Sequence, residues 1–225
     1  MNSAEQEVYE LLVSEGAIVI DTHVVLSSGG DGTPGSGNHS DGYANIKGVS
    51  DEVMQKLVSR IYRIAKYFPI DVVVGPETGG TRIATMLAEL LSISWESHVI
   101  GLPAKKTVSN EKRDFYLEDP SLVSGKDVLV AEDVLSSGES VRAVVAMIER
   151  YGGRVVVVAA IFNRGNVTAD QTGAPALICT LTKPIRVWTA AACKHDEDGL
   201  CKQGVEVNTK LGHGKAFKEK QLLVN

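Results

Sequence analysis

Residues 128–140 read VLVAEDVLSSGES, an apolar run that meets two adjacent acids and then a small polar loop. The VLV run is short, apolar and mostly β-branched, which predicts a buried strand of a parallel sheet. Glu132 and Asp133 close this strand. Because neighbouring strand residues point to opposite faces, the two carboxylates cannot share one solvated side. The serine- and glycine-rich end of the stretch predicts the start of a helix.

Strands and helices are expected to alternate on both sides of this stretch. Apolar runs predict strands at 71–75, 98–103, 127–133, 154–162 and 176–181, with shorter pieces at 17–20, 23–26 and 43–48. Apolar residues at helical spacing predict helices at 4–14, 51–68, 81–92 and 138–151, and a charged loop is expected at 104–114. Such alternation indicates an α/β fold with a parallel sheet covered by helices on both faces.

Three regions follow from this pattern. Residues 1–50 hold an N-terminal helix and short strands, and residues 51–182 form the α/β core. Residues 183–225 form a C-terminal appendage, where the chain becomes polar and lysine-rich without clear periodicity.

Composition excludes several classes of protein. The 225 residues are 44% hydrophobic and 23% charged, which is typical of a globular chain. The net charge of −5 argues against a general nucleic-acid binder. No apolar run approaches the roughly 20 residues of a membrane span, and the acidic start MNSAEQEVYELL lacks the features of a signal peptide. Three cysteines, an odd number, suit a reducing compartment, so we expect a cytoplasmic protein with no membrane or nucleic-acid partner.

The pattern G-x-G-x-x-G occurs at residues 30–35, but its context does not fit a dinucleotide site. That site needs a strand before the glycines and a helix opening on them. Here Pro34 and Gly37 interrupt the segment, which predicts a surface loop.

The stretch 132–140 predicts a more specific site. Ligands of parallel α/β sheets bind beyond the carboxyl ends of the strands, and a helix N-terminus offers backbone N–H groups to an anion. Carboxylates can accept hydrogen bonds from the two hydroxyls of a diol. When they stand a few residues before such an anion site, the pair of features predicts a site for a ribose 5-phosphate. The expected binding residues here are Glu132, Asp133, Ser136, Ser137, Gly138, Glu139 and Ser140. A polar strand end with a serine-capped helix is the alternative, and it explains the serines but not the paired acids.

This stretch resembles the signature of type I phosphoribosyltransferases, in which two acids and a hydroxyl-rich loop follow an apolar strand. The family more often has threonines and a second glycine where this chain has Ser136, Ser137 and Glu139, and we expect Glu139 to point outward. VVVGPETGGTRIA (72–84) resembles the family's pyrophosphate loop, which implies that Glu77, Thr78, Gly79 and Gly80 bind the diphosphate.

PAKKTVSNEKRD (103–114) resembles the family's mobile catalytic loop. The resemblance implies that Lys105 and Lys106 act in catalysis together with Asp133. A solvated charged loop is the alternative for a run that also contains Lys112 and Arg113.

Two further segments are similar to orotate phosphoribosyltransferases. Residues 26–49 resemble their N-terminal segment, and IFNRG (161–165) resembles a strand end at which an acid precedes an arginine, with Asn163 here in place of the acid. The resemblance implies base-binding roles for Ser136 and Arg164. Ser27 stands where a lysine is usual, and the charged loop lacks the usual basic pattern, so a purine or another pyrimidine stays open as the base.

The resemblance implies an α/β type I phosphoribosyltransferase core, with a small hood built from the N-terminal and C-terminal segments. It implies transfer of a phosphoribosyl group from 5-phosphoribosyl 1-diphosphate to a base, foremost orotate, which gives orotidine 5'-phosphate and pyrophosphate. It also implies Mg²⁺ as cofactor and a homodimer whose mobile loops are shared between chains. A non-catalytic regulator that binds the sugar diphosphate is the alternative from another class.

The tail contains Cys193, His195, Cys201 and His213, whose spacing is irregular for a zinc site. We therefore expect the two cysteines to be a pair within the tail, and no metal-binding residues.

Overall fold

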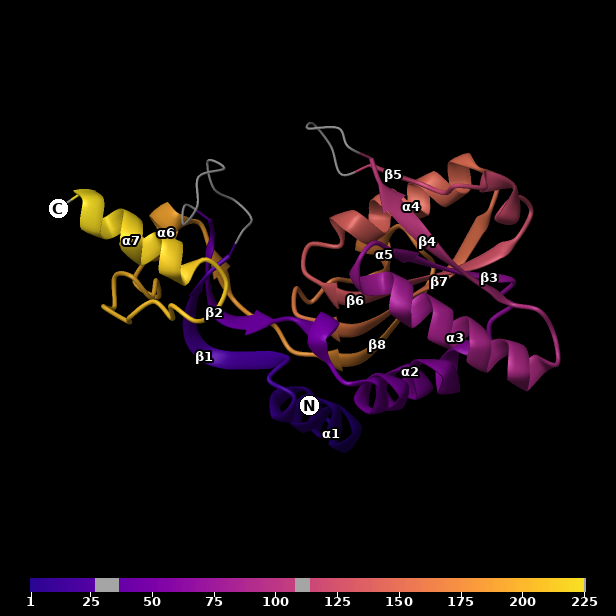
Figure 1. The fold of residues 1–225 in the computed structure, drawn as a ribbon, viewed down its shortest axis with the longest axis horizontal. Helices are drawn as coiled ribbons and strands as arrows, with labels where there is room; N and C mark the ends of the chain where they lie inside the picture. Colours follow the sequence, from indigo (N-terminus) through magenta and orange to yellow (C-terminus); the bar gives the residue numbers. More distant parts are fainter. Residues whose placement is uncertain (27–36, 108–113, 225) are drawn as a thin grey trace. The chain divides into compact units, whose positions relative to one another are not determined.

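The computed structural model describes residues 1–26, 37–107 and 114–224 (Figure 1). The chain divides into two compact units. Unit 1 comprises Met1–Leu12 and Ile46–Pro184, and unit 2 comprises Val13–Asn45 and Ile185–Asn225. We predicted that the N-terminal helix belongs with the hood segment in residues 1–50. Most of this helix instead belongs to unit 1, together with the core.

Unit 1 is built on a six-stranded sheet. Its strands, in spatial order, are β5 (Phe115–Tyr116), β4 (Ile100–Lys106), β3 (Val72–Pro76), β6 (Asp127–Leu135), β7 (Arg154–Asn163) and β8 (Leu177–Thr182). All neighbours are parallel except β4 and β5, which pair antiparallel. The expected α/β fold with a parallel sheet is confirmed. The strand expected at 98–103 is displaced, because the chain stays extended through Lys106 to pair with β5.

Helices cover both faces of this sheet (Figure 1). The helices of unit 1 are α1 (Ser3–Ser14), α2 (Asp51–Ala65), α3 (Gly79–Trp95), α4 (Glu139–Arg150) and α5 (Ala169–Thr172), with the 3₁₀ turns η1 (Ile46–Gly48) and η2 (Pro120–Leu122). Strand residues alternate between the faces: Val72, Val74 and Val130 are buried against the apolar side of α4. The intervening Val73 and Leu129 are also buried, and α3 packs on strands β3, β4 and β6 from the other face.

Parallel pairing brings the carboxyl ends of β3, β6 and β7 to one edge of the sheet. The residues that follow these ends are the turn at 77–78, the loop at 136–138 and the loop at 164–166. The segments in which the sequence predicts a site therefore share this edge.

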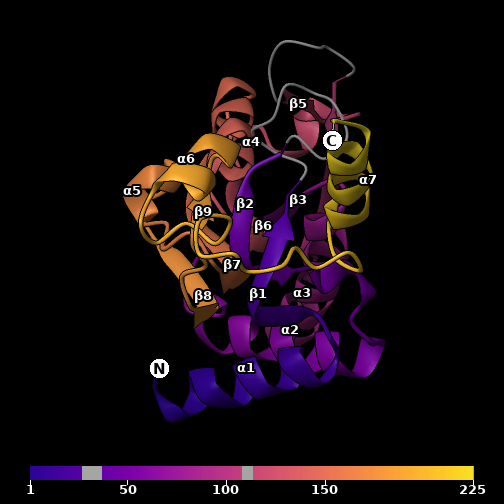
Figure 2. The same ribbon diagram turned by 90° about the vertical axis from the view of Figure 1, so that its left-hand side faces the viewer.

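Unit 2 contains a three-stranded antiparallel sheet in the order β1 (Ile18–Val25), β2 (His39–Ala44), β9 (Val187–Trp188). It also contains α6 (Ala190–His195) and α7 (Gly214–Val224). Figure 2 shows α6 beside β9 and α7 beside β1. A small hood built from N-terminal and C-terminal segments is thus confirmed.

Three details of unit 2 and its border differ from expectation. The pieces at 17–20 and 23–26 form one strand, interrupted by a register shift between Ile20 and Val24. The strand expected at 43–48 ends at Ala44, and a 3₁₀ turn follows it. The helix α7 was not predicted, because its sequence GKAFKEKQLLV carries little amphipathic signal. Among the described residues, no helix combines the length and the apolar character needed to span a bilayer.

Candidate functional site

An open recess lies where β6 ends and α4 begins. We call it the strand-end recess. It is lined by Glu132, Val134, Leu135, Ser136, Ser137, Gly138, Glu139, Ser140 and Val141. These residues come from one contiguous stretch, and they include six of the seven that the sequence predicts for the ribose 5-phosphate site.

The two adjacent acids divide between two sides of the strand end. Glu132 is buried and lines the recess. Burial raises the pKa of Glu132 well above its usual value, and the nearby negative charge of Asp133 adds to this rise. The backbone N–H of Asp133 donates to Oε1 of Glu132 at 3.0 Å. A buried carboxyl that resists ionisation can hold or accept a proton at a ligand hydroxyl.

Asp133 lies against the turn that follows β3. A Cβ atom added to Gly79 would come within 2.1 Å of Oδ2 of Asp133, so the carboxylate occupies the space beside the glycine backbone. A Cβ added to Gly80 would lie 2.3 Å from the carbonyl oxygen of Ala131, so this glycine also packs directly on β6. The N–H of Glu77 donates to the carbonyl of Ala104 at 2.9 Å. The structure therefore brings the turn at 77–80 next to the acid pair, two segments that are fifty residues apart in the sequence.

The start of α4 has the geometry of an anion site. Gly138 adopts φ of +75°, which favours glycine, and a Cβ there would also press on Val167 at 3.0 Å. Oγ of Ser137 accepts from the N–H of Glu139 at 3.4 Å. The side chain of Glu139 is exposed, which confirms the expectation that it points outward. The first N–H groups of a helix have no partner within the helix, so they can bind an anion.

Arg164 reaches the strand-end recess from β7. Its Nε donates to Oγ of Ser136 at 2.6 Å. The backbone N–H groups of Arg164 and Gly165 both donate to the carbonyl of Leu135, at 3.0 and 3.1 Å. A Cβ on Gly165 would lie 1.6 Å from the carbonyl oxygen of Ser136, so this approach requires glycine. The two residues predicted to bind the base are thus in direct contact.

Asn163, which the sequence gave no role of its own, positions this arginine. Its buried side-chain amide donates to the carbonyl of Val167 at 2.8 Å and accepts from the N–H of the same residue at 2.9 Å. These two bonds close the loop that carries Arg164. An amide supplies both a donor and an acceptor, whereas an aspartate would supply acceptors alone. The signal that could have revealed this role is an amide at the end of an otherwise apolar strand.

The two predicted catalytic lysines lie on a strand, so their placement in a loop at 104–114 was wrong. Lys105 and Lys106 pair with Tyr116 and Phe115 across the β4–β5 ladder. Lys105 forms an ion pair with Glu118, which raises the pKa of the lysine. Lys106 is exposed, and its charge acts on Glu132 in the direction that lowers the pKa of the carboxyl. Lys112 and Arg113, and the glycine-rich segment 30–35, lie outside the described residues.

Comparison with known proteins identifies relatives over most of the chain. Residues 41–197 match the profile of the family described as phosphoribosyl transferase domain. The orotate phosphoribosyltransferase of Caldicellulosiruptor bescii is 28% identical over 204 residues, which cover 90% of this chain and 95% of the relative.

Two solved structures have a similar fold. Orotate phosphoribosyltransferase from Mycobacterium tuberculosis H37Rv is 20% identical, with a TM-score of 0.56, over 80% of this chain and 96% of that one. Adenine phosphoribosyltransferase from Saccharomyces cerevisiae is 15% identical, with a TM-score of 0.53, over 79% and 99%. The fold is therefore common to proteins named for different bases.

Proposed function

Because this chain belongs to the phosphoribosyl transferase domain family, we propose that it is an orotate phosphoribosyltransferase. It would use 5-phosphoribosyl 1-diphosphate as donor and give orotidine 5'-phosphate and pyrophosphate. In this reaction the bond from the sugar carbon to the diphosphate oxygen breaks, and a bond from that carbon to a ring nitrogen of orotate forms. Orotate would attack with its ring nitrogen already deprotonated, the proton having passed to solvent, so the site needs no dedicated proton acceptor.

We propose that the donor is held by the start of α4, the acid pair at the end of β6 and the turn after β3. The N–H groups at the start of α4, with Ser137 and Ser140, would hold the 5-phosphate. Glu132 and Asp133 would accept from the sugar hydroxyls, and the turn at 77–80 would bind the diphosphate beside Asp133. Binding of the 5-phosphate, which is remote from the reacting carbon, holds the sugar so that this carbon is positioned for attack. This positioning is the main catalytic contribution that we assign to the recess.

The donor set at the strand end fits Mg²⁺. Magnesium in proteins is held by one or two carboxylates together with substrate phosphates, and the carboxylate of Asp133 lies beside the diphosphate turn. When bound, the ion would neutralise charge on the diphosphate leaving group. Lys106, whose charge already acts on Glu132, would add to that stabilisation.

The contact between Arg164 and Ser136 carries the assignment of the base. A guanidinium has five N–H donors in a planar fork, and the bond from Nε to Ser136 uses one of them while fixing the plane. Such a fork suits a planar carboxylate through two parallel hydrogen bonds. Orotate has this carboxylate, whereas uracil and the purines do not. The relatives named as orotate phosphoribosyltransferases support the same base.

Pyrophosphate release measured with orotate, uracil, adenine and hypoxanthine would test the proposal. We expect turnover with orotate, and Arg164→Ala should lower kcat/KM for orotate by about a hundredfold, the cost of removing a charged hydrogen-bond partner. The affinity for the sugar diphosphate should stay within about twofold, because a carboxylate contact does not involve the donor.

Arg154→Ala is the matched control. It removes an arginine from the other end of the same strand, where Arg154 is exposed and paired with Asp127 at 2.6 Å. Turnover of a purine but not of orotate would overturn the choice of base. Binding of the sugar diphosphate without turnover of any base would instead favour the regulator.

A further inference from the structure

Four side chains that could bind a metal ion come together in unit 2. They are His23 on β1, His39 at the start of β2, Cys193 on α6 and Cys201 in the following turn. One ligand atom from each lies within 4.8 Å of all the others. We call these residues the His–Cys cluster. From the sequence we weighed His195 and His213 as partners of the cysteines and expected no metal site, whereas the structure gathers two histidines from the N-terminal segment.

We propose that the His–Cys cluster is a structural Zn²⁺ site. A tetrahedral ion with bonds of about 2.3 Å to sulfur and about 2.0 Å to nitrogen separates its ligand atoms by about 3.3–3.8 Å. Sγ of Cys201 lies 3.4 Å from Nδ1 of His39 and 3.8 Å from Nε2 of His23. Sγ of Cys193 lies 3.7 Å from the same Nε2. Three edges of the tetrahedron are therefore already present.

The fourth separation, between Nε2 of His23 and Nδ1 of His39, is 2.7 Å, the length of a hydrogen bond. On metal binding it would lengthen to about 3.3 Å. The two other separations, from Cys193 to Cys201 and to His39, are within 4.8 Å, so shifts of about 1 Å between side chains would complete the tetrahedron.

The surroundings prepare these groups as ligands. Nδ1 of His23 lies 2.8 Å from the carbonyl of Val205, to which its N–H can donate, leaving the lone pair of Nε2 directed at the cluster. Such a bond is the usual second contact of a metal-binding histidine. The ring of His39 is fully buried, and its Nδ1 faces both Nε2 of His23 and Sγ of Cys201.

The sulfur ligands are prepared as well. The N–H of Cys201 donates to Sγ of Cys193 at 3.2 Å, which fixes the first sulfur beside the second cysteine. Sγ of Cys201 in turn faces the ring nitrogens of both histidines.

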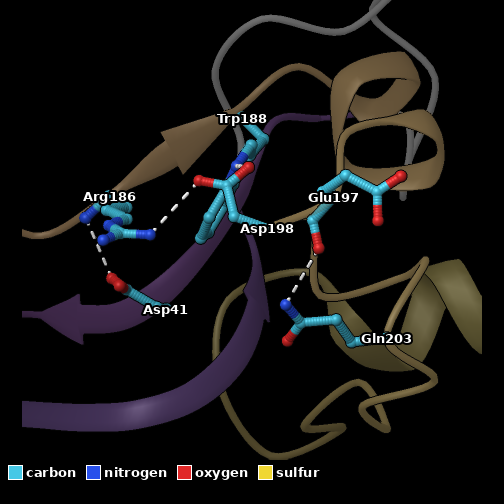
Figure 3. A network of polar contacts seen from close by, with 6 residues as sticks. All are labelled: Asp41, Arg186, Trp188, Glu197, Asp198 and Gln203. Atoms are coloured by element: carbon cyan, nitrogen blue, oxygen red, sulfur yellow. Dashed lines mark hydrogen bonds and ion pairs between the residues drawn. The ribbon is translucent and has the colours of Figure 1, made fainter.

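A rigid turn holds the second cysteine in place. A Cβ on Gly199 would lie 2.3 Å from the carbonyl oxygen of Cys193, so the turn can fold back only on glycine. Figure 3 shows the polar contacts that fix this turn: Asp198 accepts from Arg186 at 3.2 Å and from the indole N–H of Trp188 at 3.3 Å. The side chain of Gln203 donates to the carbonyl of Glu197 at 3.1 Å.

The donor set selects the metal. Two sulfurs and two imidazoles in tetrahedral positions are typical of Zn²⁺. His23, His39 and Cys193 are buried, and Cys201 is half-buried. Four protein ligands leave no open position for a substrate, so the site is structural rather than catalytic. It would join the β1–β2 hairpin to the C-terminal segment within unit 2.

Metal content of the purified chain, prepared without a histidine tag, would test this. We expect about one zinc per chain, as for a closed four-ligand site. Cys193→Ser combined with Cys201→Ser should lose it, whereas Cys179→Ser should keep it. Cys179 is the matched control, because it is a half-buried free thiol on β8 in unit 1. Removing zinc with a chelator should lower the thermal midpoint of the wild type and leave that of the double variant unchanged.

Cobalt provides a readout that does not depend on the double variant folding. Wild-type chain loaded with Co²⁺ should show the visible absorption of a tetrahedral ion with thiolate charge transfer. Cys201→His should keep cobalt but lose about half of the charge-transfer intensity, because one thiolate remains. A wild-type chain without zinc and without a tetrahedral cobalt spectrum would overturn the proposal. So would a disulfide between Cys193 and Cys201 in the freshly purified protein.

Discussion

The strand-end recess and the His–Cys cluster both gather ionisable side chains, but they are built differently. The recess presents oxygen donors from a single stretch of ten residues and is open to solvent. The cluster presents nitrogen and sulfur donors from segments up to 178 residues apart, and most of it is buried. Open oxygen donors suit a ligand that comes and goes, whereas a closed set of soft donors suits an ion that stays.

This difference implies different consequences of mutation. Replacing a side chain that contacts a substrate should lower the turnover rate but leave the fold intact, because solvent fills the vacated space. Replacing a side chain that holds two parts of a unit together should lower the stability of the fold. Measuring activity and thermal midpoint on the same variants therefore tests whether the two regions have been assigned correctly.

The largest effect is expected from Asp133→Asn, at the strand end beside the recess. The substitution removes a charge beside the diphosphate turn, so kcat should fall by about a hundredfold, the scale found when one electrostatic partner of a transition state is lost. The thermal midpoint should change little. Asp127→Asn is the control, since it alters an acid at the opposite end of the same strand. Wild-type turnover by Asp133→Asn would remove this acid from the catalytic site.

Gly79→Ala should have the next largest effect, because it probes the contact between the recess and the turn without changing any charge. The new methyl group would overlap the carboxylate of Asp133, which must then move. We expect a loss of about thirtyfold in kcat/KM, since displacement of a positioned group by about 1 Å is costly. Gly48→Ala is a suitable control, because its Cβ would meet nothing within 4 Å. Equal activity of the two variants would contradict this arrangement.

Lys105→Ala combined with Lys106→Ala should lower kcat by about tenfold with a smaller change in KM, because these charges act on the leaving group in the transition state. Lys126→Ala, at the other end of the sheet, is the control. We propose that the chain forms a homodimer in which Lys105 and Lys106 of one protomer act in the partner's site as well as in their own. Mixing the lysine variant with Asp133→Asn should then restore part of the activity. No recovery in the mixture would mean that each protomer supplies its own lysines.

The contrast between the regions also explains what the sequence could predict. The recess lies within residues 132–141, so the order of apolar, acidic and small polar residues was enough to predict the strand, the helix start and the anion site. The turn at 77–80 and Arg164 were expected at the same edge, because alternating strands and helices predict a parallel sheet, in which all strands end at one edge.

The His–Cys cluster could not be predicted in the same way. Its four side chains meet because β1 pairs irregularly with β2 and because the N–H of Asn208 donates to the carbonyl of His23. Neither contact follows from local sequence patterns. Nearness along the chain favoured His195, which is exposed. The extension of β4 through Lys106 was missed for a similar reason, because the partner strand β5 has only two residues.

Glu132→Gln should have the smallest effect on turnover and the most informative effect on stability, because Glu132 belongs to the recess yet is buried like the cluster. The folded protein raises the pKa of this carboxyl through burial. Below about pH 4.5, the usual pKa, both the folded and the unfolded chain hold the proton, and the group does not oppose folding. As the pH rises toward the raised pKa, the unfolded chain releases its proton while the folded chain keeps it, so the free energy of unfolding falls. Glutamine has no proton to release, so Glu132→Gln should be more stable than the wild type at neutral pH, with the difference vanishing near pH 4.5.

Denaturant unfolding at several pH values would measure this difference in stability, with Glu149→Gln on the exposed face of α4 as control. Parallel pH profiles for wild type and Glu132→Gln would show that Glu132 is solvated, and would place it with the open donors of the recess.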